Sequence, residues 1–209
     1  MMTDMTMDNF LAVLSSSEPV PGGGGACGYV AAVGMSLGNM VLALTTGKKK
    51  YAEYQEEIEE LIVKATDLKK RLAECMDKDA ESFKPLAAAY GLPKDTEEQI
   101  KEREAIMAKA LVTASEAPLS MMELILEAMK LIDRISVIGS RIAISDAGVG
   151  ITMCEAAMKG ASLNVFINTK LMKDRELADD MNFKADKLLA QAAQIEEETF
   201  GRVMDAVRP

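Results

Sequence analysis

The chain has 209 residues, of which 49% are hydrophobic and 27% are charged, and its formal net charge is −9. This acidity disfavours binding to nucleic acid or to an anionic membrane surface, because both require a basic face. Histidine is absent, which excludes histidine-based triads and histidine metal sites and leaves acid–base chemistry to carboxylates, lysines, tyrosines, amides and backbone groups.

The composition predicts one all-α domain over residues 1–209, because Ala, Met, Leu, Glu and Lys are abundant and aromatic residues make up only 4%. The three cysteines, Cys27, Cys75 and Cys154, are widely spaced in apolar helical runs, so small core residues are expected rather than disulfides or a zinc site. The first apolar run is too short for an export signal. A cytoplasmic protein without a metal site is expected.

The first elements are a short amphipathic helix over 5–15 and a segment over 19–47 that contains no charged residue. Prolines and glycines at 19–25 cannot continue a regular element, so a helix is predicted over 25–46. One interpretation is a membrane span flanked by lysines at 48–50. A fully buried, glycine-rich helix is favoured instead, because the segment holds Ser, Asn and Thr and no second such run occurs.

The longest periodic run covers 51–90, where apolar residues recur every three or four positions. Asp79 lies on the same face as Leu72 and Phe83, where a charge needs an explanation. The carboxylate either sits at the end of the packed region, exposed or paired with a lysine, or lines a cleft.

Gly91-Leu92-Pro93 signals a stop, and Asp95 with Glu98 has the spacing of a capping box for a helix over 96–116. Pro118 is expected to break or kink the chain before a further apolar helix over 119–140. Helices over 142–168 and 174–206 follow, the latter capped by Asp174. The whole is predicted to be a mostly antiparallel bundle.

Between Ser136 and Met153 the only charged residues are Arg141 and Asp146. A carboxylate in an apolar run either pairs, accepts several hydrogen bonds or has its pKa raised by desolvation, and the last gives an acid or base usable near neutral pH. A five-residue spacing places Arg141 poorly for a helical ion pair. Asp146 is therefore the best single catalytic candidate from the sequence.

Three motifs resemble the signatures of the formiminotetrahydrofolate cyclodeaminase / methenyltetrahydrofolate cyclohydrolase family, in the same order and over nearly the whole chain. They are Pro21-Gly22-Gly23-Gly24 before the helix that leads to Gly47-Lys48-Lys49-Lys50-Tyr51, then Ser145-Asp146-Ala147-Gly148-Val149-Gly150, and finally Gly160-Ala161-Ser162-Leu163-Asn164-Val165-Phe166-Ile167-Asn168. Two positions depart from the pattern: Gly25 stands where the family usually has Ser, and Phe166 where it commonly has Arg.

The resemblance implies a folate enzyme that converts formiminotetrahydrofolate to methenyltetrahydrofolate with loss of ammonia, or alternatively one that hydrolyses the methenyl form to formyltetrahydrofolate. Neither reaction needs a metal or redox cofactor. The resemblance also agrees with a homodimer or higher homo-oligomer, which two almost uncharged helices suggest by themselves.

Site roles follow from the glycine run and the motifs together. Backbone N–H groups at the start of a helix are free to meet a ring edge or an anion. The expected site comprises Gly22, Gly23, Gly24 and Gly25 against the ring, Asp146 as acid/base with Asp79 as second carboxylate, Lys48 or Lys49 at the glutamate tail, and Asn164 and Asn168 at the pterin edge. A non-catalytic helical oligomer is the alternative. The enzyme hypothesis requires these groups in one cleft, whereas a scaffold would scatter them.

Overall fold

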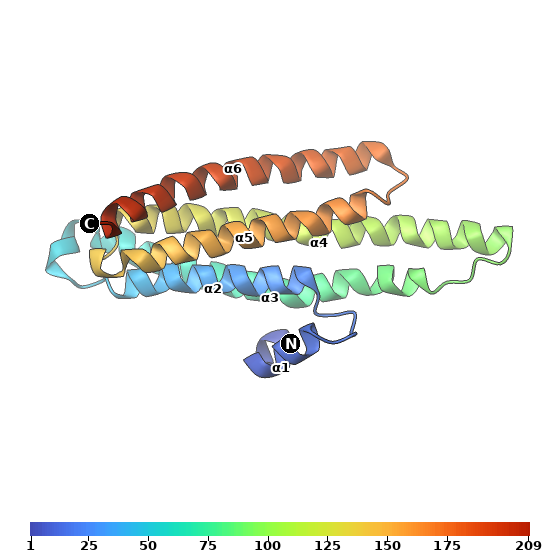
Figure 1. Cartoon of the computed structure of the whole chain (residues 1–209), viewed down its shortest axis with the longest axis horizontal. Helices are drawn as coiled ribbons and strands as arrows, with labels where there is room; N and C mark the ends of the chain where they lie inside the picture. The colour runs from blue at the N-terminus through green and yellow to red at the C-terminus, as the bar shows by residue number, and fades with distance from the viewer.

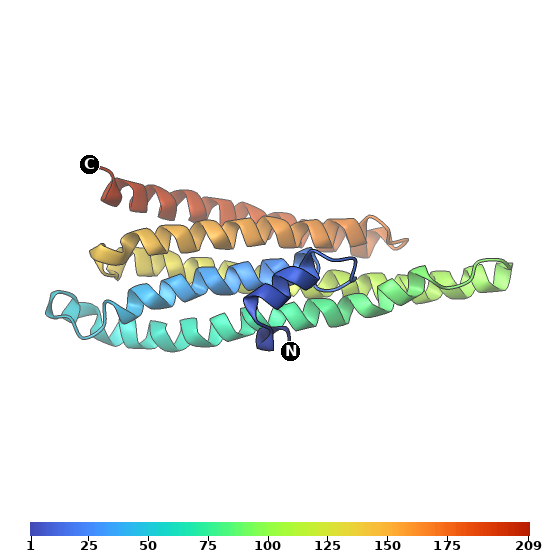
Figure 2. The same ribbon diagram turned by 60° about the horizontal axis from the view of Figure 1, so that its bottom comes forward.

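The computed structural model describes residues 1–209 as an all-helical, elongated bundle, as predicted (Figure 1). Short 3-10 helices cover Met2–Asp4 (η1), Lys49–Tyr54 (η2) and Arg141–Ala143 (η3). The α-helices are α1 (Met7–Leu14), α2 (Gly23–Ala43), α3 (Gln55–Tyr90), α4 (Glu97–Ile138), α5 (Ile144–Thr169) and α6 (Arg175–Val207). Figure 2 shows α2 to α6 lying lengthwise beside one another, with α1 outside the bundle.

Glycines let α2 approach its neighbours closely. A Cβ at Gly34 would lie 2.8 Å from both the Gly150 carbonyl oxygen and the Cys154 sulfur of α5, and a Cβ at Gly28 would lie 3.2 Å from the Leu72 carbonyl oxygen of α3. Larger side chains at these positions would push the helices apart, which explains why the sequence is rich in glycine here.

The helix α2 is buried on one side only within a single chain. Met40 is 46% exposed and the C-cap residue Leu44 is 41% exposed, although Met35 and Val41 are fully buried. The expectation of a helix buried on all sides is therefore not met by one chain alone. By length and composition α2 also passes as a candidate membrane span, and 44% of its most apolar window is buried inside the bundle.

The proline at position 118 does not end a helix, so the prediction of separate helices over 96–116 and 119–140 is wrong. A single helix, α4, runs through Pro118. Proline lacks the N–H that would bond to the carbonyl four residues earlier, and here the side-chain amide of Asn168 donates to that Ala114 carbonyl at 2.9 Å. The missing backbone bond is replaced from α5, and α4 continues.

The predicted N-terminal cap is confirmed for α6 and is wrong by one residue for α4. The α4 capping box is formed by Thr96 and Gln99 rather than by Asp95 and Glu98. Asp174 caps α6 as predicted, accepting from the Leu177 N–H at 3.1 Å.

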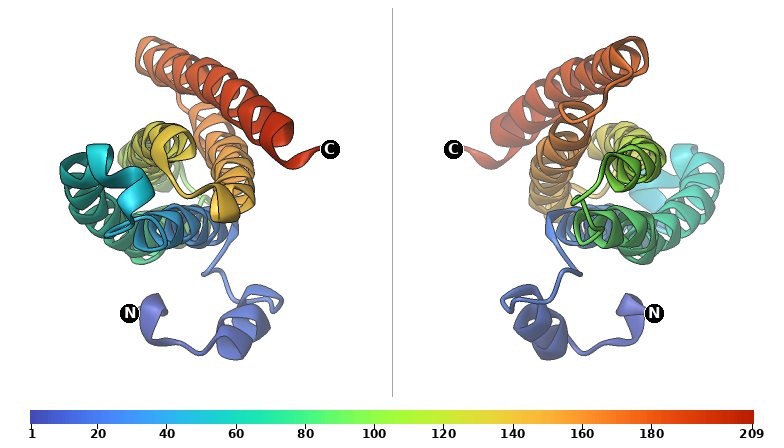
Figure 3. Two further views of the ribbon diagram at one scale, coloured as in Figure 1. Left: turned by 90° about the vertical axis from the view of Figure 1, so that its left-hand side faces the viewer. Right: turned by 90° about the vertical axis from the view of Figure 1, so that its right-hand side faces the viewer.

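The two ends of α2 contact different elements of the bundle. The start of α2 meets the middle of α3 and the last turns of α5, whereas the end of α2 lies with η2, η3 and the start of α5. The view along the bundle axis shows α2 between α3 and α5, with α6 on the outer side of α5 (Figure 3).

Candidate functional site

A cavity of about 270 Å³ opens where the chain enters α2, and it is bordered by α3, α4 and α5. Asp79 is its only titratable group. The lining residues are Pro19, Val20, Gly22, Gly23, Gly24, Asp79, Ser82, Phe83, Ala114, Asn164, Ile167 and Asn168. Of the two explanations for Asp79 on an apolar face, the structure shows the carboxylate lining a cleft.

Asp79 caps α2 from a neighbouring helix. The N-cap residue of α2 is Gly22, which has no side chain to offer, and the Asp79 carboxylate accepts a hydrogen bond from the backbone N–H of Gly25 instead. A Cβ at Gly24 would overlap this carboxylate. The glycine run thus leaves room for an acidic side chain against the positive end of the helix dipole.

Burial raises the pKa of the Asp79 carboxyl above its usual range, and the hydrogen bond from Gly25 opposes this effect without cancelling it. Desolvation disfavours the charged form because the surrounding protein solvates a carboxylate less well than water does. A carboxyl group in this state is suited to exchange protons with a bound molecule.

A half-buried thiol lies close to the same carboxylate. Burial, together with the negative charge of Asp79, raises the pKa of Cys27 to about 11. The thiol is therefore protonated near neutral pH and is a poor nucleophile.

Two amides from the last turns of α5 border the cavity. Asn164 donates to the Gly160 carbonyl of its own helix at 3.0 Å, and Asn168 donates to the Ala114 carbonyl of α4 at 2.9 Å. Each side chain retains an oxygen that accepts no hydrogen bond from the protein, because each has turned its NH2 group to a carbonyl. These oxygens are acceptors available to a ligand.

The predicted site residues at the other end of the bundle do not reach this cavity. Asp146 lies in the first turn of α5, 18 residues before Asn164, which corresponds to about 27 Å along the helix. Lys48 and Lys49 are exposed, and the Lys48 ammonium lies 3.5 Å from the Ser140 hydroxyl at that end. One chain therefore does not gather all the predicted groups in one cleft. Gly25 is buried and contributes its N–H to Asp79 rather than to the cavity surface.

The Arg141–Asp146 ion pair that the sequence left open does not form, since neither residue takes part in any salt bridge. The backbone N–H of Arg141 instead donates to the Tyr51 hydroxyl at 3.1 Å. The cavity residues to which the sequence assigned no site role are Pro19, Val20, Ser82, Phe83, Ala114 and Ile167. Ser82 had a detectable signal, because it lies three residues after Asp79 and so on the same face of α3.

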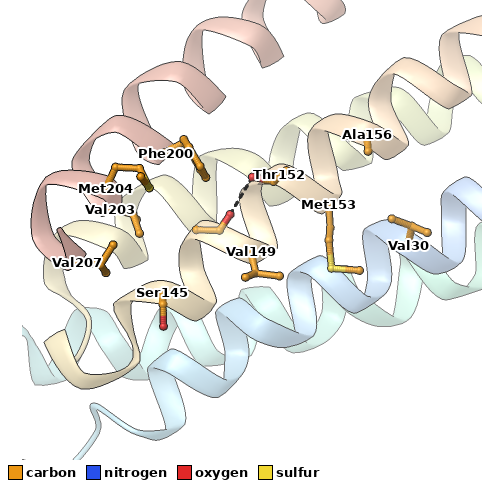
Figure 4. Close-up of a pocket in the computed structure, with 11 residues that line it drawn as sticks. Val30, Ser145, Val149, Thr152, Met153, Ala156, Phe200, Val203, Met204 and Val207 are labelled. Carbon is orange, nitrogen blue, oxygen red and sulfur yellow. Dashed lines mark hydrogen bonds between the residues drawn. The ribbon is translucent and has the colours of Figure 1, made fainter.

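A second cavity, of about 460 Å³, lies between α2, α5 and α6 and contains no titratable group (Figure 4). Val30, Val149, Met153 and Phe200 are among its lining side chains, and the Thr152 hydroxyl in it already donates to the Gly148 carbonyl at 3.1 Å. This larger hollow suits apolar contacts, whereas the Asp79 cavity suits proton transfer. The chain has no group of three or more His, Cys, Asp or Glu side chains arranged to hold a metal ion.

Comparison with known proteins gives consistent similarities along the chain. The family model described as formiminotransferase-cyclodeaminase matches residues 6–187. The chain is 37% identical over 202 residues to the methenyltetrahydrofolate cyclohydrolase of Methylorubrum extorquens, and the match covers 97% of each chain.

Two further kinds of relative are more distant. The chain is 30% and 27% identical to the formimidoyltransferase-cyclodeaminases of Dictyostelium discoideum and Mus musculus, and it spans 35% of the length of each. The crystal structure of formiminotetrahydrofolate cyclodeaminase from Thermotoga maritima superposes with a TM-score of 0.84 at 23% identity, covering 99% of this chain and 98% of that one. The last comparison shows a shared fold.

Proposed function

The chain belongs to the formiminotransferase-cyclodeaminase family of folate one-carbon enzymes, and we propose that it hydrolyses methenyltetrahydrofolate to formyltetrahydrofolate. The observation that carries this choice is the match over 97% of both chains with a cyclohydrolase. The cyclodeaminase reaction, which the sequence motifs first suggested, is the second candidate, because the bifunctional relatives share the same segment at 27–30% identity.

The proposed chemistry uses Asp79 as the group that moves a proton. Water bonds to the methenyl carbon while the Asp79 carboxylate accepts a proton from it. The hydroxyl group on that carbon then gives its proton to solvent and becomes the formyl C=O, while the bond from the carbon to one ring nitrogen breaks and the proton on Asp79 passes to the departing nitrogen. The formyl group stays on the other nitrogen, and one proton is released overall because the methenyl substrate is a cation. No electrons are exchanged, so the proposed reaction needs no redox cofactor.

In the deaminase direction the same carboxyl would protonate ammonia as it leaves. A carboxyl whose pKa is raised by burial serves both reactions, because the tetrahedral carbon and the proton transfers are similar. The two functions are separated by assay: purified protein is given methenyltetrahydrofolate and formiminotetrahydrofolate in parallel, and methenyl absorbance is followed. We expect faster turnover of the methenyl substrate. No turnover of either substrate contradicts both proposals.

The Asp79 cavity is too small to enclose a whole folate. Ligand pockets for molecules of this size typically span about 300–1,000 Å³, compared with about 270 Å³ here. We propose that the ring enters the cavity against Gly22, Gly23 and Gly24, while the rest of the substrate passes over the exposed side chain of Ile167.

We further propose that a second copy of the chain packs on this face. The outward stripe of α5 carries one charged residue among small and apolar ones: Ser145, Val149, Thr152, Ala156, Lys159, Leu163 and Ile167. Val149 and Leu163 are 52% and 68% exposed and lie at equal distances from Ala156. This symmetry fits an antiparallel α5 pair centred on Ala156, in which Leu163 of one copy enters the apolar cavity beside Val149 of the other.

Such a pair brings the two ends of the bundle together. Residues n and 312 − n face each other when the pair is centred on residue 156, so Asp146 of one copy comes next to Phe166 and Ile167 of the other. We therefore propose that Lys48, Lys49 and Asp146 act at the Asp79 cavity of the second copy, with the lysines toward the glutamate tail. The predicted cleft is then completed by dimerisation.

Cysteine cross-linking tests this arrangement. Ala156→Cys places the new thiol on the two-fold axis, where it faces the same thiol of the second copy. We therefore expect a covalent dimer on a non-reducing gel. Leu163→Cys is the matched control, because two copies of position 163 lie about 21 Å apart along the helices. Efficient cross-linking of Leu163→Cys alone, or a monomer in light scattering at micromolar concentration, contradicts the proposed pair.

A further inference from the structure

Pro118, inside α4, and the cavity residue Asn168 are linked through one carbonyl group. In an uninterrupted α-helix the N–H of residue 118 would bond to the carbonyl of Ala114, and proline has no N–H to give. The Asn168 amide supplies the missing donor at 2.9 Å, within the buried interface of α4 and α5.

This contact fixes which way the Asn168 amide faces. A carbonyl oxygen can only accept, so the NH2 group of Asn168 must point to Ala114 and the side-chain oxygen must point elsewhere. Asn168 is only 9% exposed, and Asn168 and Ala114 both line the Asp79 cavity. Asn164 also donates to a carbonyl, that of Gly160, but this carbonyl belongs to its own helix, so the contact does not join α5 to α4.

We propose that Pro118 is a positioning residue that holds the Asn168 oxygen toward the cavity as a fixed acceptor for a ring N–H. The ligand class is a heteroaromatic ring with amide-like and amino N–H donors along one edge, and the proposal rests on the folate function given above. A pre-oriented acceptor binds such an edge without paying the entropy of selecting one amide orientation.

The prediction concerns Pro118→Ala, which returns a backbone N–H to the Ala114 carbonyl. This N–H competes with the Asn168 amide for the carbonyl oxygen, so the amide is held less firmly in one orientation. We expect the Michaelis constant for the folate substrate to rise about three- to tenfold, the value of one neutral hydrogen bond, with a smaller change in kcat. Pro85→Ala in α3 is the matched control, because Pro85 also lies inside a helix but is exposed and outside the cavity. It should leave the Michaelis constant unchanged.

Two measurements separate positioning from a merely structural role. In an Asn168→Ala background, Pro118→Ala should no longer raise the Michaelis constant; an undiminished rise there overturns the proposal. The second uses a competing folate analogue that carries a methyl group in place of the ring amino group. Wild type should prefer the amino compound several-fold, Pro118→Ala should lose most of this preference, and retention of the full preference overturns the proposal.

Urea unfolding tests the clamp, the hydrogen bond from the Asn168 amide to the Ala114 carbonyl, without any folate. Asn168→Ala should lower the unfolding midpoint of the wild type more than that of Pro118→Ala, because only the wild type leaves the Ala114 carbonyl without a partner. Equal shifts would show that the contact has no energetic role and overturn the proposal. If this coupling is present but neither folate substrate is turned over, the proposed function fails while the clamp stands.

Discussion

Replacing Gly24 by alanine tests whether the glycine run exists to admit the Asp79 carboxylate. A Cβ at position 24 would overlap that carboxylate, whereas a Cβ at Gly23 would meet nothing closer than the Asn164 amide nitrogen at 3.9 Å. The two positions are adjacent in the first turn of the same helix. They therefore make a matched pair that differs in the space beside them.

The expected magnitude combines two opposing effects. Alanine in place of a helical glycine stabilises by about 0.5–1 kcal/mol. Displacing Asp79 removes its hydrogen bond from Gly25, and a hydrogen bond to a charged group contributes about 1.5–3 kcal/mol. Gly24→Ala should therefore destabilise by about 1–2 kcal/mol, and Gly23→Ala should be neutral or stabilising.

Urea denaturation followed by far-UV circular dichroism measures both variants. With a slope of about 2 kcal/mol per molar urea, the Gly24→Ala midpoint should fall by about 0.5–1 M. In an Asp79→Ala background the overlap is gone, so Gly24→Ala should lose its penalty. Equal stabilisation by Gly23→Ala and Gly24→Ala in the wild-type background would refute the claim that the Asp79 carboxylate occupies the space beside Gly24.

Three further predictions concern single residues. Asp79→Asn should lower turnover about a hundred- to ten-thousandfold while folate still binds, whereas Asp146→Asn should chiefly raise the Michaelis constant; steady-state kinetics showing the reverse pattern would make Asp146 the acid/base. Burial raises the pKa of Asp79, so the folded state favours the protonated carboxyl and ionisation of this group opposes folding. The stability that the protonated form contributes is lost as the pH rises through the folded-state pKa of Asp79. Asp79→Asn should thus be more stable than wild type at pH 7, with the difference vanishing below about pH 4, and a urea series showing a gain that grows toward acid would contradict this sign. Asp174→Ala should cost about 1 kcal/mol by removing the α6 cap, and Asp174→Asn should restore most of that loss in the same unfolding assay.

The helices were predictable because their signals are local. The periodicity of α3 and the Asp174 cap depend on residues a few positions apart, and the structure confirms both. The continuity of α4 was not predictable, because the donor that rescues the Ala114 carbonyl lies 54 residues away on α5. A local rule about proline cannot include a partner that only the tertiary fold supplies.

The sequence predicts on which face of its helix a site residue lies. It does not predict at which end of the bundle that residue lies. Asp79 shares a face with Leu72 and Phe83, and the fold places that face at the start of α2. Asp146 and Asn168 belong to one helix and to two neighbouring motifs, yet 22 residues separate them by about 33 Å. Two motifs that are neighbours in the sequence therefore place Asp146 and Asn168 far apart in space.

The hydrogen bond from Gly25 to Asp79 also gives the cavity a signal that can be followed without substrate turnover. Glycine amides resonate in a sparsely occupied part of the nitrogen–proton correlation spectrum, and this chain has only 14 glycines. The Gly25 cross-peak should shift as Asp79 gains or loses its proton, so a titration would give the pKa of the carboxyl directly. The same peak, followed during addition of a folate, would report when the ring reaches the start of α2.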